Sequence, residues 1–158
     1  MKRLSCALSA VICLAVLNLR AASISHESLA FRNQVEQFLQ EEGFKPTIDS
    51  SDDSVCFKYE GESFWLTVQN KGPYYIELHI AGFTVENTNR SYILAACNYT
   101  NRNQMCGKAY LSSDSLKITV EFYCMSFSSF KSVFYQLLSS AKATKKAVKD
   151  CYDDLDDE

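Results

Sequence analysis

Apolar residues recur at helical spacing in three segments, at residues 26–42, at about 88–101 and from residue 126 onward. Gly43 follows the first segment, where a C-cap glycine would end a helix. The apolar stripe of the third segment weakens after Ala141, where lysines crowd the last turns. The inward positions predicted for the three helices are Leu29, Val35, Phe38 and Leu39; Tyr92, Ile93, Ala96 and Cys97; and Phe127, Phe130, Phe134, Leu137 and Leu138.

Between these helices the hydrophobic period changes to two, which predicts strands at residues 55–59, 64–69, 75–80, 108–111 and 116–123. Turn-forming residues at 60–62, 70–73 and 112–115 separate neighbouring strands, so an antiparallel meander is the simplest pairing. One face of each strand is apolar. The inward set is Phe64, Leu66, Ile76, Leu78, Ile118, Val120 and Phe122, and the outward set is Trp65, Thr67, Tyr75, Glu77, His79, Thr119, Glu121 and Tyr123.

This order, α-β-β-β-α-β-β-α, predicts an α+β fold in which a five-stranded antiparallel sheet carries its helices on one face. We found no internal repeat or linker, so we expect one domain at residues 24–150 and an acidic C-terminal tail at residues 151–158. Blocks of like charge repel, and we expect this tail to be solvated rather than to bind calcium.

The N-terminus has the layout of a cleaved secretory signal peptide over residues 1–23. Lys2 and Arg3 precede an apolar run at residues 4–17, and small residues follow at 21–23. The alternative, an uncleaved membrane anchor, is less favoured because the run is shorter than the roughly 20 residues that a spanning helix needs. We therefore expect export to the periplasm or the extracellular space, and no membrane association after cleavage.

Charge argues against a nucleic-acid partner. Lys2, Arg3 and Arg20 leave with the signal, so the 16 basic residues become 13 against 19 acidic ones and the net charge becomes −6. Phosphate backbones are bound through clustered Lys and Arg. The mature domain is acidic and shows no basic stripe in its sequence, so we expect no nucleic-acid binding.

Five cysteines remain in the mature chain: Cys56, Cys97, Cys106, Cys124 and Cys151. In an oxidising compartment a Cys97–Cys106 disulfide could tie the second helix to the fourth strand. Buried free thiols are an equal alternative in a chain of this size. No paired Cys-x-x-Cys spacing predicts a metal site, and we expect no cofactor.

Catalysis by a thiol would need Cys56 and His79 to meet on the outward side of the sheet. No cysteine-protease signature surrounds Cys56, and no oxyanion-hole glycine motif is present. The alternative is two unrelated strand residues that point outward. We expect no catalytic residue.

The outward side of the sheet carries the candidate site. Trp65, Tyr75, His79 and Tyr123 would share it, and an exposed aromatic patch on a polar surface is typical of protein-binding sites. The competing interpretation is that Tyr and Trp are good strand formers on a solvated face.

Four short runs of residues give the chain a resemblance to a known family. They are Phe38-Leu39-Gln40-Glu41-Glu42-Gly43-Phe44, Phe57-Lys58-Tyr59-Glu60-Gly61-Glu62, Ala96-Cys97-Asn98-Tyr99 and Gly107-Lys108-Ala109-Tyr110. In this order and spacing, over residues 35–147, the chain resembles the YbjN-like domains, which share their plan with type III secretion chaperones. The resemblance implies a non-enzymatic scaffold that acts as a regulator or a chaperone-like binder.

We therefore predict an exported protein-interaction module whose partner the sequence does not identify and for which a homodimer is one arrangement. Two alternatives remain. One is a cystatin-like small-ligand binder with a cavity near Phe83 and Tyr99, and the other is a thiol enzyme that uses Cys56.

Overall fold

The structure is a computed structural model that describes residues 26–69, 73–84, 90–113 and 115–156. The predicted signal peptide at residues 1–23 lies outside this part of the chain. In chain order, the helices and strands are α2 (His26–Glu41), β1 (Thr47–Ile48), β2 (Val55–Tyr59), β3 (Glu62–Gln69), β4 (Tyr74–Thr84), α3 (Arg90–Asn103), β5 (Gly107–Ser112), β6 (Ser115–Cys124) and α4 (Phe127–Asp156).

The strands form one antiparallel sheet in the order β1-β2-β3-β4-β6-β5. This confirms the predicted α+β fold, with one strand more than expected. The additional strand, β1, has only two residues and therefore no period that a sequence pattern could reveal. A two-residue turn joins β2 to β3 and places Glu60 and Gly61 at φ 49° and 82°.

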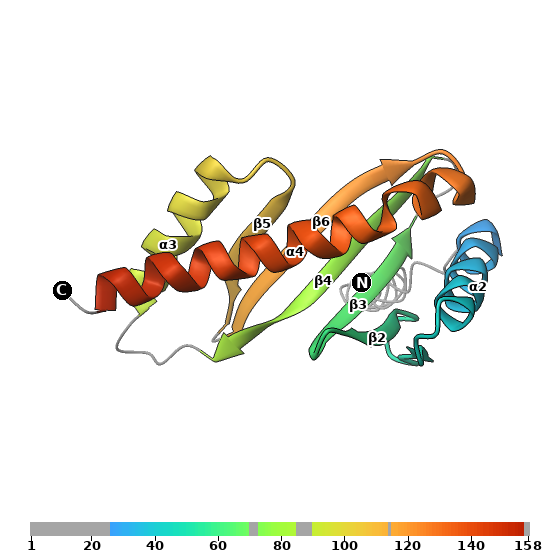
Figure 1. Cartoon of the computed structure of the whole chain (residues 1–158), viewed down its shortest axis with the longest axis horizontal. Coiled ribbons are helices and arrows are strands. Elements are labelled where there is room, and N and C mark those ends of the chain that lie inside the picture. Colours follow the sequence, from blue (N-terminus) through green and yellow to red (C-terminus); the bar gives the residue numbers. More distant parts are fainter. Residues whose placement is uncertain (1–25, 70–72, 85–89, 114, 157–158) are drawn as a thin grey trace, which may run out of the picture.

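The helices pack on one face of this sheet, and α4 crosses β4, β6 and β5 between α2 at one end and α3 at the other (Figure 1). The predicted inward strand residues form the core beneath them. Five of them are fully buried: Phe64, Leu66, Ile76, Leu78 and Ile118. Trp65, from the outward set, is only half-buried. Strand alternation thus assigned the two faces of the sheet correctly.

Two predicted helix positions are wrong. Leu29 is 37% exposed on α2 and Tyr92 is 43% exposed on α3. Their helices instead bury Phe31 and Thr100. Phe31 packs on Tyr74 with ring centroids 4.3 Å apart, so a contact with β4 decides how α2 is rotated.

The last helix extends further than its apolar stripe suggested. α4 runs for 30 residues and includes residues 151–156, which we expected to be a solvated tail. Tyr152 is half-buried and stacks at a tilt against Phe83 of β4, with ring centroids 5.8 Å apart. Two lysine–aspartate pairs at helical spacing, Lys146–Asp150 and Lys149–Asp153, support these turns.

Candidate functional site

The outer face of the sheet, the one opposite the helices, brings the predicted site residues into two adjacent regions. Trp65 of β3 lies opposite His79 of β4, and Tyr75 of β4 lies opposite Tyr123 of β6. Because opposite residues on antiparallel strands have their Cβ atoms about 4.5–5.5 Å apart, each pair is in contact range. All four predicted residues therefore lie on one face, as the alternation of the strands required.

The two tyrosines form the more exposed region. Their ring centroids are 5.3 Å apart at an interplanar angle of 53°, and Tyr123 is 70% exposed. Tyr75 is half-buried, and burial together with a hydrogen bond to Glu121 raises its pKa. The Tyr75 side chain is therefore a neutral hydroxyl at physiological pH.

A paired polar centre separates the tyrosines from Trp65. Glu77 and Glu121 lie opposite one another, an arrangement of like charges that is unfavourable unless it is compensated. Lys108 compensates Glu121, because its Nζ lies 2.7 Å from Glu121 Oε2, and His79 Nε2 lies 3.1 Å from Glu77 Oε1. The Lys108 contact is the main reason that the pKa of Glu121 is lowered. Lys108 therefore offsets the charge of Glu121, and Glu77 has a polar contact with His79 on the same strand.

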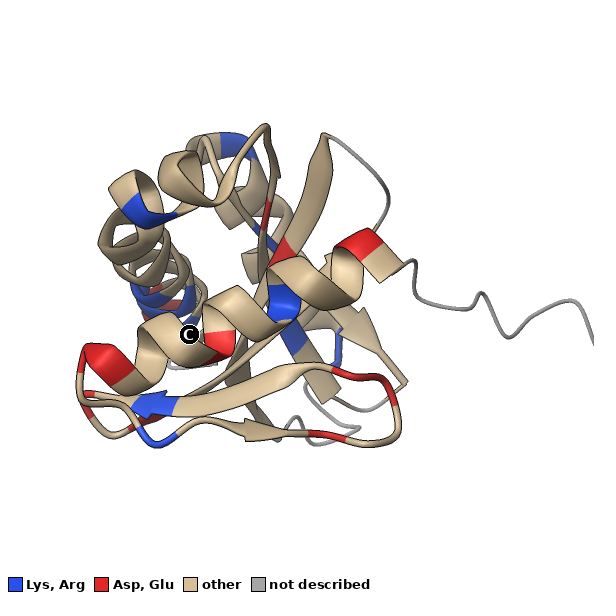
Figure 2. Ribbon diagram, turned by 90° about the vertical axis from the view of Figure 1, so that its right-hand side faces the viewer, with Lys and Arg blue, Asp and Glu red and all other residues tan. Residues whose placement is uncertain are grey.

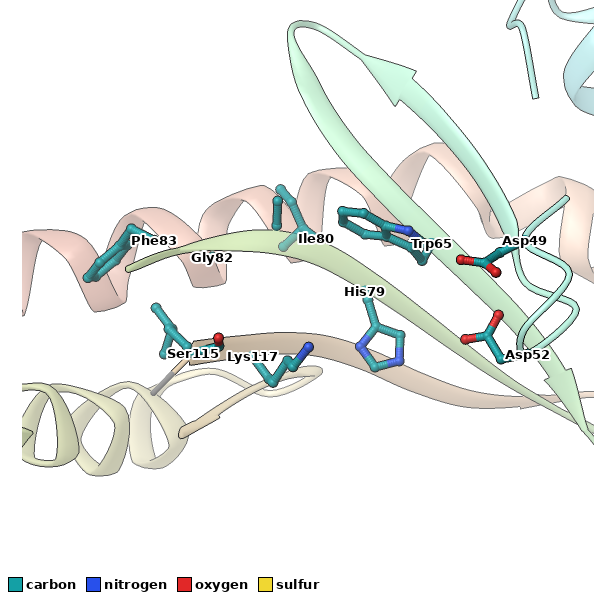
Figure 3. Close-up of a pocket in the computed structure, with 11 residues that line it drawn as sticks. Asp49, Asp52, Trp65, His79, Ile80, Gly82, Phe83, Ser115 and Lys117 are labelled. Atoms are coloured by element: carbon teal, nitrogen blue, oxygen red, sulfur yellow. The ribbon is translucent and has the colours of Figure 1, made fainter. Parts of the chain in front are cut away.

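Trp65 stands between two hollows. One, of about 400 Å³, continues over His79 and Lys117 and is bounded by Asp49 and Asp52 of the β1–β2 loop (Figure 3). The other, of about 520 Å³, runs past Cys56 to Phe44 and is more apolar. Trp65 therefore lines both hollows.

The β1–β2 loop holds its two aspartates in place through hydrogen bonds and one ion pair. The Asp49 backbone N–H donates to the Ser54 carbonyl oxygen at 2.9 Å. The N–H of Ser54 also donates to Asp52 Oδ1 at 3.0 Å. Arg32 of α2 anchors the loop to the helix layer through a 2.7 Å contact with Asp53. The predicted site residues did not include Asp49, Asp52 or Lys117: only Lys117 lies at an outward strand position that alternation could have found, whereas loop residues carry no period.

Cys56 and His79 do not meet. Both point to the outer face, but Trp65 lies between them, because Cys56 pairs with Trp65 and Trp65 pairs with His79. Two strand spacings amount to about 10 Å, well beyond hydrogen-bond reach. The expectation that this thiol and imidazole could approach one another is wrong.

The Cys97–Cys106 bridge that we considered is not formed in the structure, in which Cys56, Cys97, Cys106, Cys124 and Cys151 are all free thiols. Cys97 is buried on α3 and Cys106 is exposed just before β5, so the two side chains belong to different environments. Burial raises the pKa of Cys97 to about 11, which keeps it protonated and unreactive.

The described residues were also compared with what a metal site, a membrane span or a basic patch requires. Among them, no group of three or more His, Cys, Asp or Glu residues is arranged to hold a metal ion. Within the same residues, no helix is both long and apolar enough to cross a bilayer. Basic positions are spread over helices and strands in the view of Figure 2.

The cystatin-like alternative required Phe83 and Tyr99 to border a common cavity. Tyr99 is 61% exposed on α3, and Phe83 instead packs against Tyr152. The hollow beside Trp65 is lined by Phe83 but not by Tyr99, so the described residues do not place the two around one cavity there.

Together these features define an α+β domain with a helix-covered inner face and an aromatic, hollowed outer face. A family model named YbjN, described as "Putative bacterial sensory transduction regulator", matches residues 32–132. The chain belongs to the YbjN family, as its resemblance to YbjN-like domains had indicated.

A solved structure supports the fold. The crystal structure of YbjN from E. coli, described as "a putative transcription regulator", aligns with a TM-score of 0.55 at 12% sequence identity. The alignment covers 72% of this chain and 87% of that chain. Identity this low shows a shared fold alone. The search of the curated proteins found no match.

Proposed function

We propose that this chain is an exported, non-enzymatic interaction module that binds a protein partner through the outer face of its sheet, in a regulatory or chaperone-like role. The observation that carries the proposal is the Tyr75–Tyr123 pair, an aromatic contact with an exposed Tyr123 ring on a face that none of the described helices covers. Solvent-exposed aromatic clusters are typical of binding surfaces. The description of the family as a regulator agrees with a non-catalytic role.

The experiment is a double substitution, Trp65→Ala with Tyr75→Ala, compared with Tyr99→Ala as a control. Tyr99 is also an exposed tyrosine, but it lies on α3 in the helix layer. Partners are crosslinked in the native host and identified by mass spectrometry, and the oligomeric state is measured by light scattering. We expect the double variant to lose the partner, or the dimer if the partner is a second copy, while Tyr99→Ala keeps it.

A third variant protects this test against unfolding. Tyr123→Ser removes the ring that is 70% exposed and should leave the core intact. If both outer-face variants stay folded by circular dichroism and retain the same partners and oligomeric state, the proposed surface is wrong.

Export is tested separately. Mass spectrometry of the protein from its native host should find a mature N-terminus near Ser23, because small residues at 21–23 follow the apolar run. A mature chain that still carries residues 1–20 would contradict cleavage.

A further inference from the structure

The hollow beside Trp65 contains charges that the protein itself leaves unpaired. It lies over β3, β4 and β6, with Asp49 and Asp52 at one end and Lys117 toward the other (Figure 3). Three neighbouring carboxylates have partners: Glu77 contacts His79, Glu121 pairs with Lys108, and Asp53 pairs with Arg32 of α2. Within the described part of the chain, neither Asp49, Asp52 nor Lys117 forms an ion pair.

The two aspartates are charged and keep acceptor capacity. Ser51 donates to Asp49 Oδ1 from its backbone N at 2.9 Å and from Oγ at 2.7 Å, and these bonds hold the pKa of Asp49 below its ordinary value. Asp52 uses Oδ1 to accept the N–H of Ser54. In both residues the described hydrogen bonds use Oδ1 and leave Oδ2 available for a ligand.

The separation of the charges sets the length of a ligand. Lys117 on β6 pairs with Ala81 on β4, and Trp65 on β3 lies one strand further. Two strand spacings give about 10 Å between the Lys117 strand and the Trp65 strand, and the aspartate loop lies on the far side of Trp65. Trp65 and His79 line the floor between the two ends.

We propose that this hollow binds a short peptide with free termini, in an extended conformation. Its ammonium group lies at Asp49 and Asp52, its carboxylate lies at Lys117, and its backbone crosses Trp65. An extended chain rises at most about 3.3–3.6 Å per residue, so at least three residues are needed to span the separation. A volume of about 400 Å³ is in the size range of small-ligand sites.

This peptide site shares Trp65 with the proposed docking surface but does not depend on the Tyr75–Tyr123 pair. It requires both charges of the ligand and a minimum length, and it would be present whether or not the tyrosine region binds a partner.

Trp65 is the only tryptophan in the chain, so its fluorescence reports on this hollow directly. We would titrate the full mature chain with alanine, dialanine, trialanine and tetraalanine, and with trialanine blocked by N-acetylation or by C-amidation. Trialanine should bind most tightly among the three shortest. Each blocked form should bind about two- to fivefold more weakly, because an ion pair with an exposed side chain such as Asp52 or Lys117 contributes at most about 1 kcal/mol.

Matched variants show which residues bind each end of the peptide. Asp49→Asn combined with Asp52→Asn should abolish discrimination against N-acetyl-trialanine, and Lys117→Gln should abolish discrimination against trialanine amide. Asparagine keeps the Oδ1 acceptor, so the loop hydrogen bonds persist. The controls are Asp150→Asn and Lys146→Gln, which remove charges from a pair on α4.

Three results would overturn the proposal: no fluorescence change or binding heat with trialanine at millimolar concentration, equal binding of free and blocked trialanine, or unchanged discrimination in the folded variants. Tight binding of a linear diamine that Lys117→Gln does not change would identify a cation site instead, and this result would also refute the peptide proposal.

Discussion

Gly107 gives the sharpest test of how α4 is seated on the sheet. A Cβ atom built on this buried residue of β5 would lie 1.9 Å from Thr144 Oγ1 and 2.8 Å from Thr144 Cβ. Thr144 is fully buried and donates to the Ser140 carbonyl oxygen at 2.8 Å, so its side chain has little room to move. Replacing Gly107 by alanine must therefore push the helix away from the strand.

The magnitude of the effect follows from two opposing terms. Alanine restricts the unfolded chain and by itself would stabilise the protein by about 0.4–1 kcal/mol. Overpacking a buried site costs about 1–3 kcal/mol, and a 1.9 Å approach is at the severe end. We expect Gly107→Ala to lower the free energy of unfolding by about 2 kcal/mol, which is a fall in Tm of roughly 6–10 °C in a domain of this size.

Thermal unfolding followed by circular dichroism measures this effect, and Thr144→Ala serves as the partner substitution. The double variant should recover part of the loss, because Oγ1 and Cγ2 of Thr144 are removed, with a coupling of about 0.5–3 kcal/mol. Gly43→Ala is the control: nothing lies within 4 Å of its Cβ position, and its φ of +87° makes its cost a backbone effect without coupling to Thr144. Additive losses from Gly107→Ala and Thr144→Ala would refute the steric argument.

Two further outcomes are expected. The Asn101 side chain hydrogen-bonds both the N–H and the C=O of Ala109, on edge strand β5, at 2.8 Å. Asn101→Ala should therefore destabilise the protein by about 1–3 kcal/mol and speed hydrogen exchange of the Ala109 amide. Unchanged exchange at Ala109 would contradict this role. In a thiol titration of the native protein at pH 8, the reagent should label exposed Cys106. Buried Cys97, with its pKa raised to about 11, should be labelled only after unfolding. Rapid labelling of Cys97 in the native state would show that α3 is not packed as described.

The candidate site was predictable only where it lies on regular strands. Alternation placed Trp65, Tyr75, His79 and Tyr123 on the outer face, and the structure confirms that placement. It could not show that Trp65 lies directly between Cys56 and His79, because that depends on the register of the three strands. Nor could it bring the β1–β2 loop beside Trp65, because a loop has no period and its position depends on hydrogen bonds and on the Arg32–Asp53 contact.

The sequence by itself determined the α+β class, the order of helices and main strands, and which face of each strand is buried. These properties follow from local periods of two and 3.6 residues, which hydrophobic burial converts into one-sided strands and helices. The tertiary structure alone decided the rotation of α2 about Phe31, the continuation of α4 along Phe83 to Asp156, and the hollow with unpaired charges beside Trp65. Each of these depends on contacts between residues far apart in the chain, and no local pattern records them.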